Sequence, residues 1–258
     1  MIFEYKNNDT KKKHQIEVYD SVQNLPIKRF QKFNKYQMIA AEIGNSFSDY
    51  DARTAKTLEF LKKDMVKEAI QELENRRQTV FNAMNEFTPF GRSFAVLIKR
   101  IDEVNYIGYT PDDLDRILIH LEEIGFDVET AVDKLVEVKK KIDLELTVYF
   151  PRFFKKSGFD ENTALRVSVL NMQCDEIIYK RDFTENIFTV EKEMLENSKP
   201  NIWNVHREGN MERTLEVDFE KYATSIKEHI DLDIETTTTF TFYATVEHLI
   251  EKLTPNED

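Results

Sequence analysis

Residues 24–53 read NLPIKRFQKFNKYQMIAAEIGNSFSDYDAR, and this stretch decides how the fold is interpreted. On a helix, at about 100° per residue, its apolar residues share one arc: Ile27, Phe30, Phe33, Met38 and Ala41. The opposite side carries four bases, with Tyr36 and Ile39 among them: Lys28, Arg29, Lys32 and Lys35. Single-stranded nucleic acid binds where aromatic and basic residues lie side by side. The pattern therefore predicts a helix with a buried apolar face and a solvated basic face, ended by Gly44.

The composition favours a mainly α protein. Its 258 residues include six Gly and six Pro, whereas the helix-compatible residues Lys, Glu, Leu and Ile are plentiful. We predict a bundle-like protein of several helices with a short N-terminal β-hairpin. The one cysteine, Cys174, excludes an internal disulfide and a cysteine zinc cage, and its apolar helical surroundings predict a buried thiol. No apolar run of 18 residues is present, so no membrane span is expected.

Charge is distributed unevenly along the chain. The net charge is −12, yet residues 1–100 carry 18 Lys/Arg against 13 Asp/Glu, and the remaining residues carry 18 against 35. A chain this acidic is a poor general binder of nucleic acid, because phosphate neutralisation needs a concentrated positive field. Two interpretations stay open: the basic part of one copy meets the acidic part of another, or both parts are solvated.

The remaining segments predict a hairpin and a series of helices. MIFEYK and HQIEVYDSV alternate apolar and polar residues around a Lys-rich turn, as a small hairpin does. From Ser48 to about Glu86, apolar residues recur at three- and four-residue steps, which predicts one long helix with a capping box of Ser48 and Asp51. The alternative is a break near NRRQT (75–79). Further helices are expected at residues 90–101, 111–123, 128–150, 161–181, 185–197 and 215–230, and from Thr239 onward.

Local signals mark several helix ends. An aromatic residue followed by Thr precedes three expected helices, at FTP (87–89), YTP (109–111) and DFTENIF (182–188). Thr110 and Asp113 have capping-box spacing, and Gly125 and Gly158 are predicted stops. The segment YFPRFFKKSG around Pro151 is the expected division of the chain. The predicted domains are an N-terminal extension or hairpin (1–23), an N-terminal helical domain (24–157) and a C-terminal helical domain (158–258).

The sequence contains no catalytic signature. Neither the P-loop nor the dinucleotide fingerprint can be written on the chain, and its five histidines lack zinc-ligand spacing. The acidic runs PDDLD (111–115) and DLDIE (231–235) fit a helix start and an incomplete calcium loop. We therefore expect no enzyme activity, no cofactor and no metal site. The alternatives are a nucleic-acid-binding or regulatory module that uses residues 27–35, and an enzyme with a site assembled from distant carboxylates with His120 or His206.

Longer strings resemble a known class of proteins. These are LPIKRFQKFNKYQMIAAEIGNSFSDYDARTAKTLEFL, RRQTVFNAMNEFTPFGRSFAVLIKRID, KPNIWNVHREGNMERTLEVDFEKYATSI and TFTFYATVEHLIEKL. The chain resembles virion structural proteins of crAss-like bacteriophages and related tailed phages. The resemblance touches most of residues 24–253.

The resemblance implies a particular place for the protein in a phage particle. It implies a non-enzymatic, predominantly helical ring or adaptor protein between portal and tail, located in the virion neck or tail and assembled in the host cytoplasm. The implied partners are further copies of itself, in a cyclic homo-oligomer with the portal's usual twelvefold symmetry, and neighbouring ring, portal or tail proteins. The acidic balance of this chain, separately from the resemblance, fits a lumen through which DNA only passes, without adhering. The candidate interface residues are Lys28, Arg29, Lys32, Lys35 and Trp203.

Overall fold

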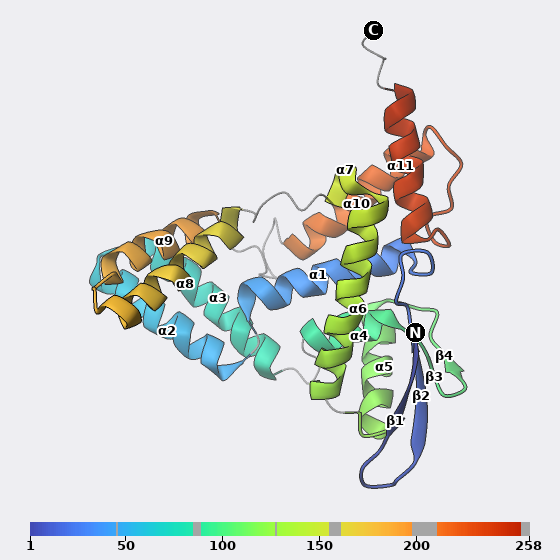
Figure 1. Ribbon diagram of the computed structural model, residues 1–258, viewed down its shortest axis with the longest axis horizontal. Helices are drawn as coiled ribbons and strands as arrows, with labels where there is room; N and C mark the ends of the chain where they lie inside the picture. Colours follow the sequence, from blue (N-terminus) through green and yellow to red (C-terminus); the bar gives the residue numbers. More distant parts are fainter. Residues whose placement is uncertain (45, 85–88, 127, 155–160, 198–210, 254–258) are drawn as a thin grey trace.

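The computed structural model confirms a mainly α protein with a short N-terminal β-hairpin (Figure 1). It describes residues 1–258 except for 45, 85–88, 127, 155–160, 198–210 and 254–258. The helices of the described residues are α1 (Ile27–Ile43), α2 (Phe47–Lys62), α3 (Val66–Met84), α4 (Pro89–Leu97), α5 (Pro111–Glu123), α6 (Val128–Tyr149), α7 (Pro151–Phe154), α8 (Glu161–Tyr179), α9 (Thr184–Asn197), α10 (Met211–Lys227) and α11 (Thr239–Leu253). The strands are β1 (Ile2–Lys6), β2 (Lys13–Val18), β3 (Ile98–Ile101) and β4 (Val104–Asn105).

The expected hairpin is confirmed and belongs to a larger sheet. β1 and β2 pair in antiparallel register from Ile2 opposite Glu17 to Lys6 opposite Lys13. β3 then pairs with β2, and β4 with β3, so the strand order is β1-β2-β3-β4. The prediction that residues 98–101 continue the preceding helix was wrong. Ile101 lies opposite Ile16 and is fully buried, because pairing with β2 outweighs the local helical pattern.

One hydrophobic core joins both ends of the chain. It contains residues of β2 and β3 and of helices α1, α4, α5, α6, α10 and α11. Leu25, just before α1, accepts hydrogen bonds at its carbonyl from the backbone N–H and the hydroxyl of Thr239, each 2.8 Å long. Ile27 N–H donates to the Thr237 carbonyl at 3.0 Å. Residues more than 200 positions apart therefore lie together at the centre of the fold. We call the elements that share this core the main body.

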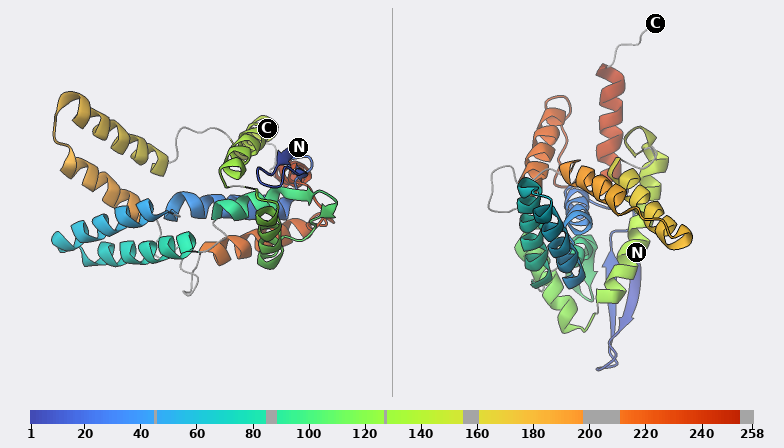
Figure 2. Two further views of the ribbon diagram at one scale, coloured as in Figure 1. Left: turned by 90° about the horizontal axis from the view of Figure 1, so that it is seen from below. Right: turned by 90° about the vertical axis from the view of Figure 1, so that its left-hand side faces the viewer.

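Helices α2, α3, α8 and α9 form an arm on one side of this body (Figure 2). The single long helix expected from Ser48 to Glu86 was wrong: α2 ends at Lys62 and α3 begins at Val66. Asp64 between them has a φ of 57°, which turns the chain back on itself. The capping box is also displaced, since Ser46 and Asp49 form it, not Ser48 and Asp51.

The arm has its own small core. Phe60 of α2 and Ala69 of α3 pack with Phe188 and Leu195 of α9. α8 packs against α9. The expectation of a buried Cys174 was wrong, because its position on α8 is exposed.

Several helix ends follow the local signals. Thr110 and Asp113 form the predicted capping box, with Pro111 in the first turn of α5. Gly44 and Gly125 have φ values of 80° and 71° and end their helices as expected. The Thr of the FTP motif, the predicted stop at Gly158 and Trp203 lie outside the described residues.

The predicted domain division at residues 157–158 stays a prediction. What the structure shows is that packing crosses it in two places. α9 contacts α2 and α3 in the arm, and α10 and α11 share the main core with α1.

Candidate functional site

The basic residues of α1 do not face solvent, so the prediction of a solvated basic face was wrong. Arg29 is 1% exposed and Lys35 is 4% exposed, and Lys28 and Lys32 are half-buried. Tyr36, which shares this side on the helical wheel, is buried with the core. Met38, expected on the apolar face, is instead exposed. The side opposite the expected apolar face is thus covered, and α10 provides much of the cover.

Arg29 ties α1 to two other parts of the main body. Its Nη1 donates to the carbonyls of Val96 at 2.6 Å and Ile98 at 3.2 Å. Its Nη2 donates to the three consecutive carbonyls of residues 106–108, at 2.8, 3.1 and 2.8 Å. Val96 lies in the last turn of α4, where backbone carbonyls lack partners within the helix and favour a nearby cation. Burial lowers the pKa of the Arg29 guanidinium, which still stays charged at neutral pH. Its role is structural.

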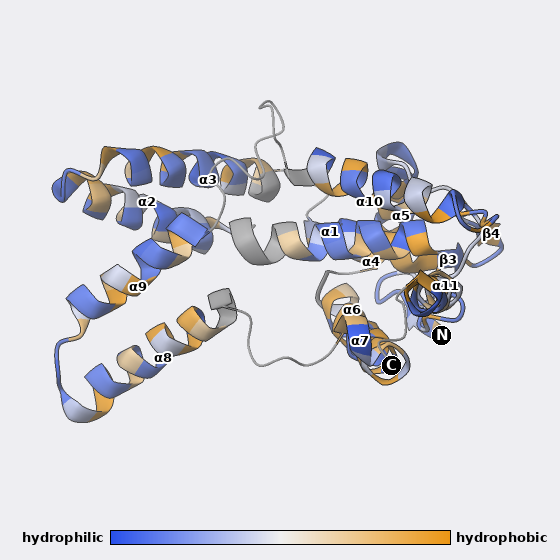
Figure 3. Ribbon diagram, turned by 90° about the horizontal axis from the view of Figure 1, so that it is seen from above, coloured by the Kyte–Doolittle hydropathy of each residue, from blue (hydrophilic) through white to orange (hydrophobic). Residues whose placement is uncertain are grey.

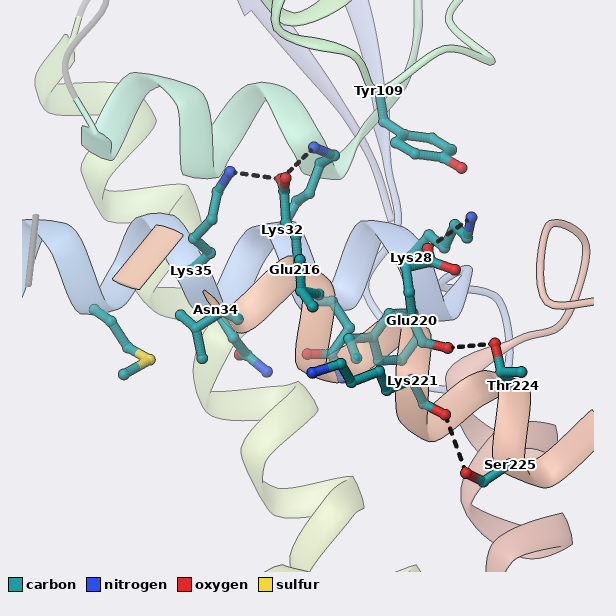
Figure 4. A pocket seen from close by; sticks show the side chains of 15 residues that line it. Lys28, Lys32, Asn34, Lys35, Tyr109, Glu216, Glu220, Lys221, Thr224 and Ser225 are labelled. Carbon is teal, nitrogen blue, oxygen red and sulfur yellow. Dashed lines mark hydrogen bonds and ion pairs between the residues drawn. The ribbon is translucent and has the colours of Figure 1, made fainter. Parts of the chain in front are cut away.

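The three lysines line a groove between α1 and α10 (Figure 4). Its volume is about 900 Å³. Lys28, Lys32 and Lys35 come from successive turns of α1, and Glu216 and Glu220 come from successive turns of α10. Apolar side chains make up much of the remaining lining: Met38, Leu215, Val217 and Phe219.

Ion pairs connect the two walls of this groove. Glu216 Oε1 lies 3.1 Å from Lys32 Nζ and 3.0 Å from Lys35 Nζ. Lys28 Nζ lies 3.1 Å from Glu220 and also contacts Glu235, in the segment between α10 and α11. The basic segment near the start of the chain therefore meets the acidic later part within one molecule.

The titration behaviour of these groups follows from the pairing. Burial by itself lowers the pKa of Lys28, but hydrogen bonds to Glu235 and Glu220 raise it above its ordinary value. Burial by itself raises the pKa of Glu216, but the Lys35 and Lys32 ammonium groups lower it below its ordinary value. Burial and a hydrogen bond to Glu235 raise the pKa of Tyr109 to about 12. At neutral pH Lys28 is therefore cationic, Glu216 anionic and Tyr109 neutral.

The groove lacks the arrangement of an acid–base or nucleophilic site. Carboxylates already pair with Lys28, Lys32 and Lys35, and the raised pKa of Lys28 makes its amine a poor base and nucleophile. His120, from the enzyme alternative, contacts the Tyr106 hydroxyl at its Nδ1, 2.5 Å away, and does not line the groove. His206 lies outside the described residues. Across the part of the chain that the structure describes, no three His, Cys, Asp or Glu side chains gather closely enough to hold a metal ion.

Sequence reasoning selected Lys28, Lys32 and Lys35 but missed their partners. Glu216 and Glu220 were not singled out, although their four-residue spacing matches the spacing of the lysines along α1. The signal was the charge asymmetry between the two parts of the chain. It was interpreted as solvated charge or as contact between copies, whereas the structure shows pairing within one copy.

Among the described helices, none is both long and apolar enough to cross a bilayer. In comparisons with known proteins, no protein family, curated protein or solved structure matches this chain.

Proposed function

We propose that this protein is a non-catalytic structural component of a tailed-phage virion, a ring or adaptor that connects portal and tail. It would act by binding further copies of itself in a cyclic oligomer and by binding adjacent ring, portal or tail proteins. The proposal starts from the resemblance of its sequence to virion structural proteins of crAss-like phages. Its place is the virion neck or tail, after assembly in the host cytoplasm.

The observation that best supports an assembly role is the apolar surface of the arm. Phe47, Val66, Met84 and Ile177 are each more than half exposed, and all four lie on the arm helices. Exposed apolar side chains that gather on one part of a protein often mark sites of protein–protein contact. An arm that extends from the main body and carries such surface is suited to reach a neighbouring subunit (Figure 2).

The groove argues against the nucleic-acid alternative. Phosphate binding needs lysines whose charge is available to the ligand. Here Lys28, Lys32 and Lys35 are already paired with carboxylates of the same chain, and the net charge is −12. An acidic subunit fits a lumen through which DNA passes without adhering.

The mass of the purified protein in solution tests the proposal. We expect light scattering over a wide concentration range to show one discrete large species, and electron microscopy to show closed rings. A protein that stays monomeric at every concentration contradicts self-assembly into a ring. A ring observed with a different symmetry supports the structural role and corrects the expected twelve copies.

A further inference from the structure

The groove between α1 and α10 has recessed cations and outward carboxylates (Figure 4). The side chains of Lys28, Lys32 and Lys35 are 18%, 17% and 4% exposed. Those of Glu216 and Glu220 are 50% and 59% exposed. A buried ammonium group needs an anionic partner, because an unpaired buried charge is costly. A half-exposed carboxylate has no such need, since water solvates it when it turns outward. The ammonium groups are therefore the fixed part of this site, and the carboxylates are the exchangeable part.

The same groove offers apolar surface to a ligand. Met38 on α1 and Val217 on α10 line it and are 39% and 49% exposed. In Figure 3, α10 runs beside α1 and carries hydrophobic and hydrophilic positions in alternation. From Lys28 to Met38 the wall formed by α1 extends for about 15 Å, or about three helical turns. The volume of about 900 Å³ is large enough for several side chains of a ligand. A ligand that fills the groove combines carboxylates with apolar side chains.

Charge selects the class of this ligand. Among the described residues that line the groove, Lys221 is a fourth amine, and the acids are Glu216 and Glu220. Glu235 contacts Lys28 from beside the groove, so the amines still exceed the carboxylates. A small excess of positive charge suits one or two carboxylates. A nucleic acid would bring a row of phosphates against these glutamates and against a chain with a net charge of −12.

Helix α10 shows how an acidic helix meets these lysines. Glu216 pairs with Lys32 and Lys35, and Glu220 pairs with Lys28. Residues four positions apart lie one turn apart on the same side of a helix, so acids with this spacing match lysines on successive turns of α1. An amphipathic helix that lies in a groove is a common mode of peptide recognition.

We propose that the groove binds a short amphipathic helix of a partner protein, whose carboxylates take the places of Glu216 and Glu220 and whose apolar side chains contact Met38 and Val217. The two glutamates then act as an internal stand-in for the partner. This inference goes beyond the proposed function, because the site requires neither self-assembly nor a virion.

Fluorescence anisotropy with a designed peptide tests the site in 50 mM salt. The probe is a fluorescein-labelled peptide of about 16 residues, which as a helix is about 24 Å long and exceeds the groove. It carries Glu and Leu on one face and Ala and Gln elsewhere, and a matched peptide has Gln in place of each Glu. We expect saturable binding of the Glu peptide, about tenfold tighter than binding of the Gln peptide, and a marked loss of affinity in 500 mM salt. No saturable binding, or equal binding of the two peptides, would overturn the proposal.

Two variants of the groove should change the affinity in opposite directions. Lys32→Gln should weaken binding of the Glu peptide about fivefold, because it removes a recessed cation. Glu216→Gln should strengthen it about two- to fivefold, because it removes a competing carboxylate. A groove that serves stability alone would be loosened by both substitutions, so a shift of both affinities in the same direction refutes the site. The control is Lys139→Gln, which changes an exposed lysine outside the groove that pairs with Asp143, and it should leave the affinity unchanged.

Val217→Asn tests the apolar part of the site. Val217 is half exposed, so the variant should keep the far-UV circular dichroism and urea midpoint of the unmodified protein. It should weaken binding about threefold, and unchanged binding contradicts the proposed contact. This variant also keeps the test decisive if Lys32→Gln unfolds.

The mass of the protein in solution separates this site from the proposed function. A monomer that binds the Glu peptide supports the site and contradicts autonomous ring formation. A discrete oligomer that does not bind the peptide refutes the site and leaves self-assembly intact.

Discussion

Replacing Arg29 by Met tests whether the buried guanidinium holds the main body together. Met matches the aliphatic stem of Arg and its helix propensity, so the substitution removes the charge and the five hydrogen bonds and leaves the space of the guanidinium group unfilled. Each hydrogen bond to a charged group contributes about 1.5–3 kcal/mol. The full sum is not expected, because removing the charge also removes its desolvation cost. Breaking buried charged interactions typically costs about 3–5 kcal/mol, and we expect a loss in that range.

The assay is urea unfolding at pH 7 followed by circular dichroism at 222 nm. With a slope of about 3 kcal/mol per M for a chain of this size, the midpoint should fall by about 1 M or more. Arg29→Lys should lose roughly half as much, because one ammonium group cannot reach both carbonyl clusters. Arg116→Met, at an exposed helical position, is the control and should change stability by less than about 0.5 kcal/mol. A midpoint for Arg29→Met within 0.3 M (about 1 kcal/mol) of the unmodified protein refutes the structural role of Arg29.

Four further predictions concern other parts of the molecule. Burial by itself raises the pKa of Asp20, but Lys141 and the Met1 amino group lower it from 3.8 to about 2. The lowered pKa stabilises the folded protein by about 2 kcal/mol above about pH 4, and this stabilisation is lost as the pH falls through about 2. In urea unfolding, the Asp20→Asn variant should therefore be less stable than the unmodified protein at pH 7 and nearly equal to it near pH 2. Phe60→Ala should lower the stability of the arm by about 3–4 kcal/mol, and so speed amide hydrogen exchange in α9 but not in α5. Unchanged exchange in α9 would contradict the packing of Phe60 against that helix. Asp64→Val should lower stability by about 1–2 kcal/mol in urea unfolding, because the φ of 57° at this position disfavours β-branched residues. Asp64→Gly should be neutral or stabilising, since glycine adopts this φ freely. Equal effects of the two substitutions would argue against the turn. Glu216→Gln should lower the free energy of unfolding by only about 1 kcal/mol, because Glu216 is half exposed. Asp218→Asn, at an exposed position on the same helix, is the control and should leave stability unchanged. The stability difference between Glu216→Gln and the unmodified protein should shrink in 1 M salt.

Features that depend on neighbouring residues were predicted well. The cap of Thr110 and Asp113 and the stops at Gly44 and Gly125 involve residues within a few positions of each other. The break between α2 and α3 was missed because Lys63–Met65 contains no Gly or Pro and the apolar spacing continues across it. The cap of α2 is Ser46 and not the predicted Ser48. Each serine is followed three residues later by an aspartate, so the local spacing does not distinguish between them.

Features that depend on distant residues were predicted poorly. β3 forms because β2, about 80 residues earlier, offers it a pairing edge. The basic side of α1 is covered by α10, which begins almost 170 residues later, so a helical wheel of α1 alone assigns it to solvent. Arg29 illustrates the same limit: its acceptors are backbone carbonyls of residues 96–108, which leave no mark on the sequence of α1.

The closure of the main body by Leu25, Ile27, Thr237 and Thr239 has a consequence for synthesis of the chain. α1 leaves the ribosome early, at about 5–20 residues per second, but the segment that completes its surroundings follows more than 200 residues later. For ten seconds or more, the aromatic residues and unpaired lysines of the nascent α1 have no native cover. Contacts this distant in sequence also slow folding, because the closure entropy of a long loop precedes any stabilisation by the contact. Transiently exposed apolar surface of this kind promotes aggregation, so we expect synthesis of the full chain to benefit from molecular chaperones.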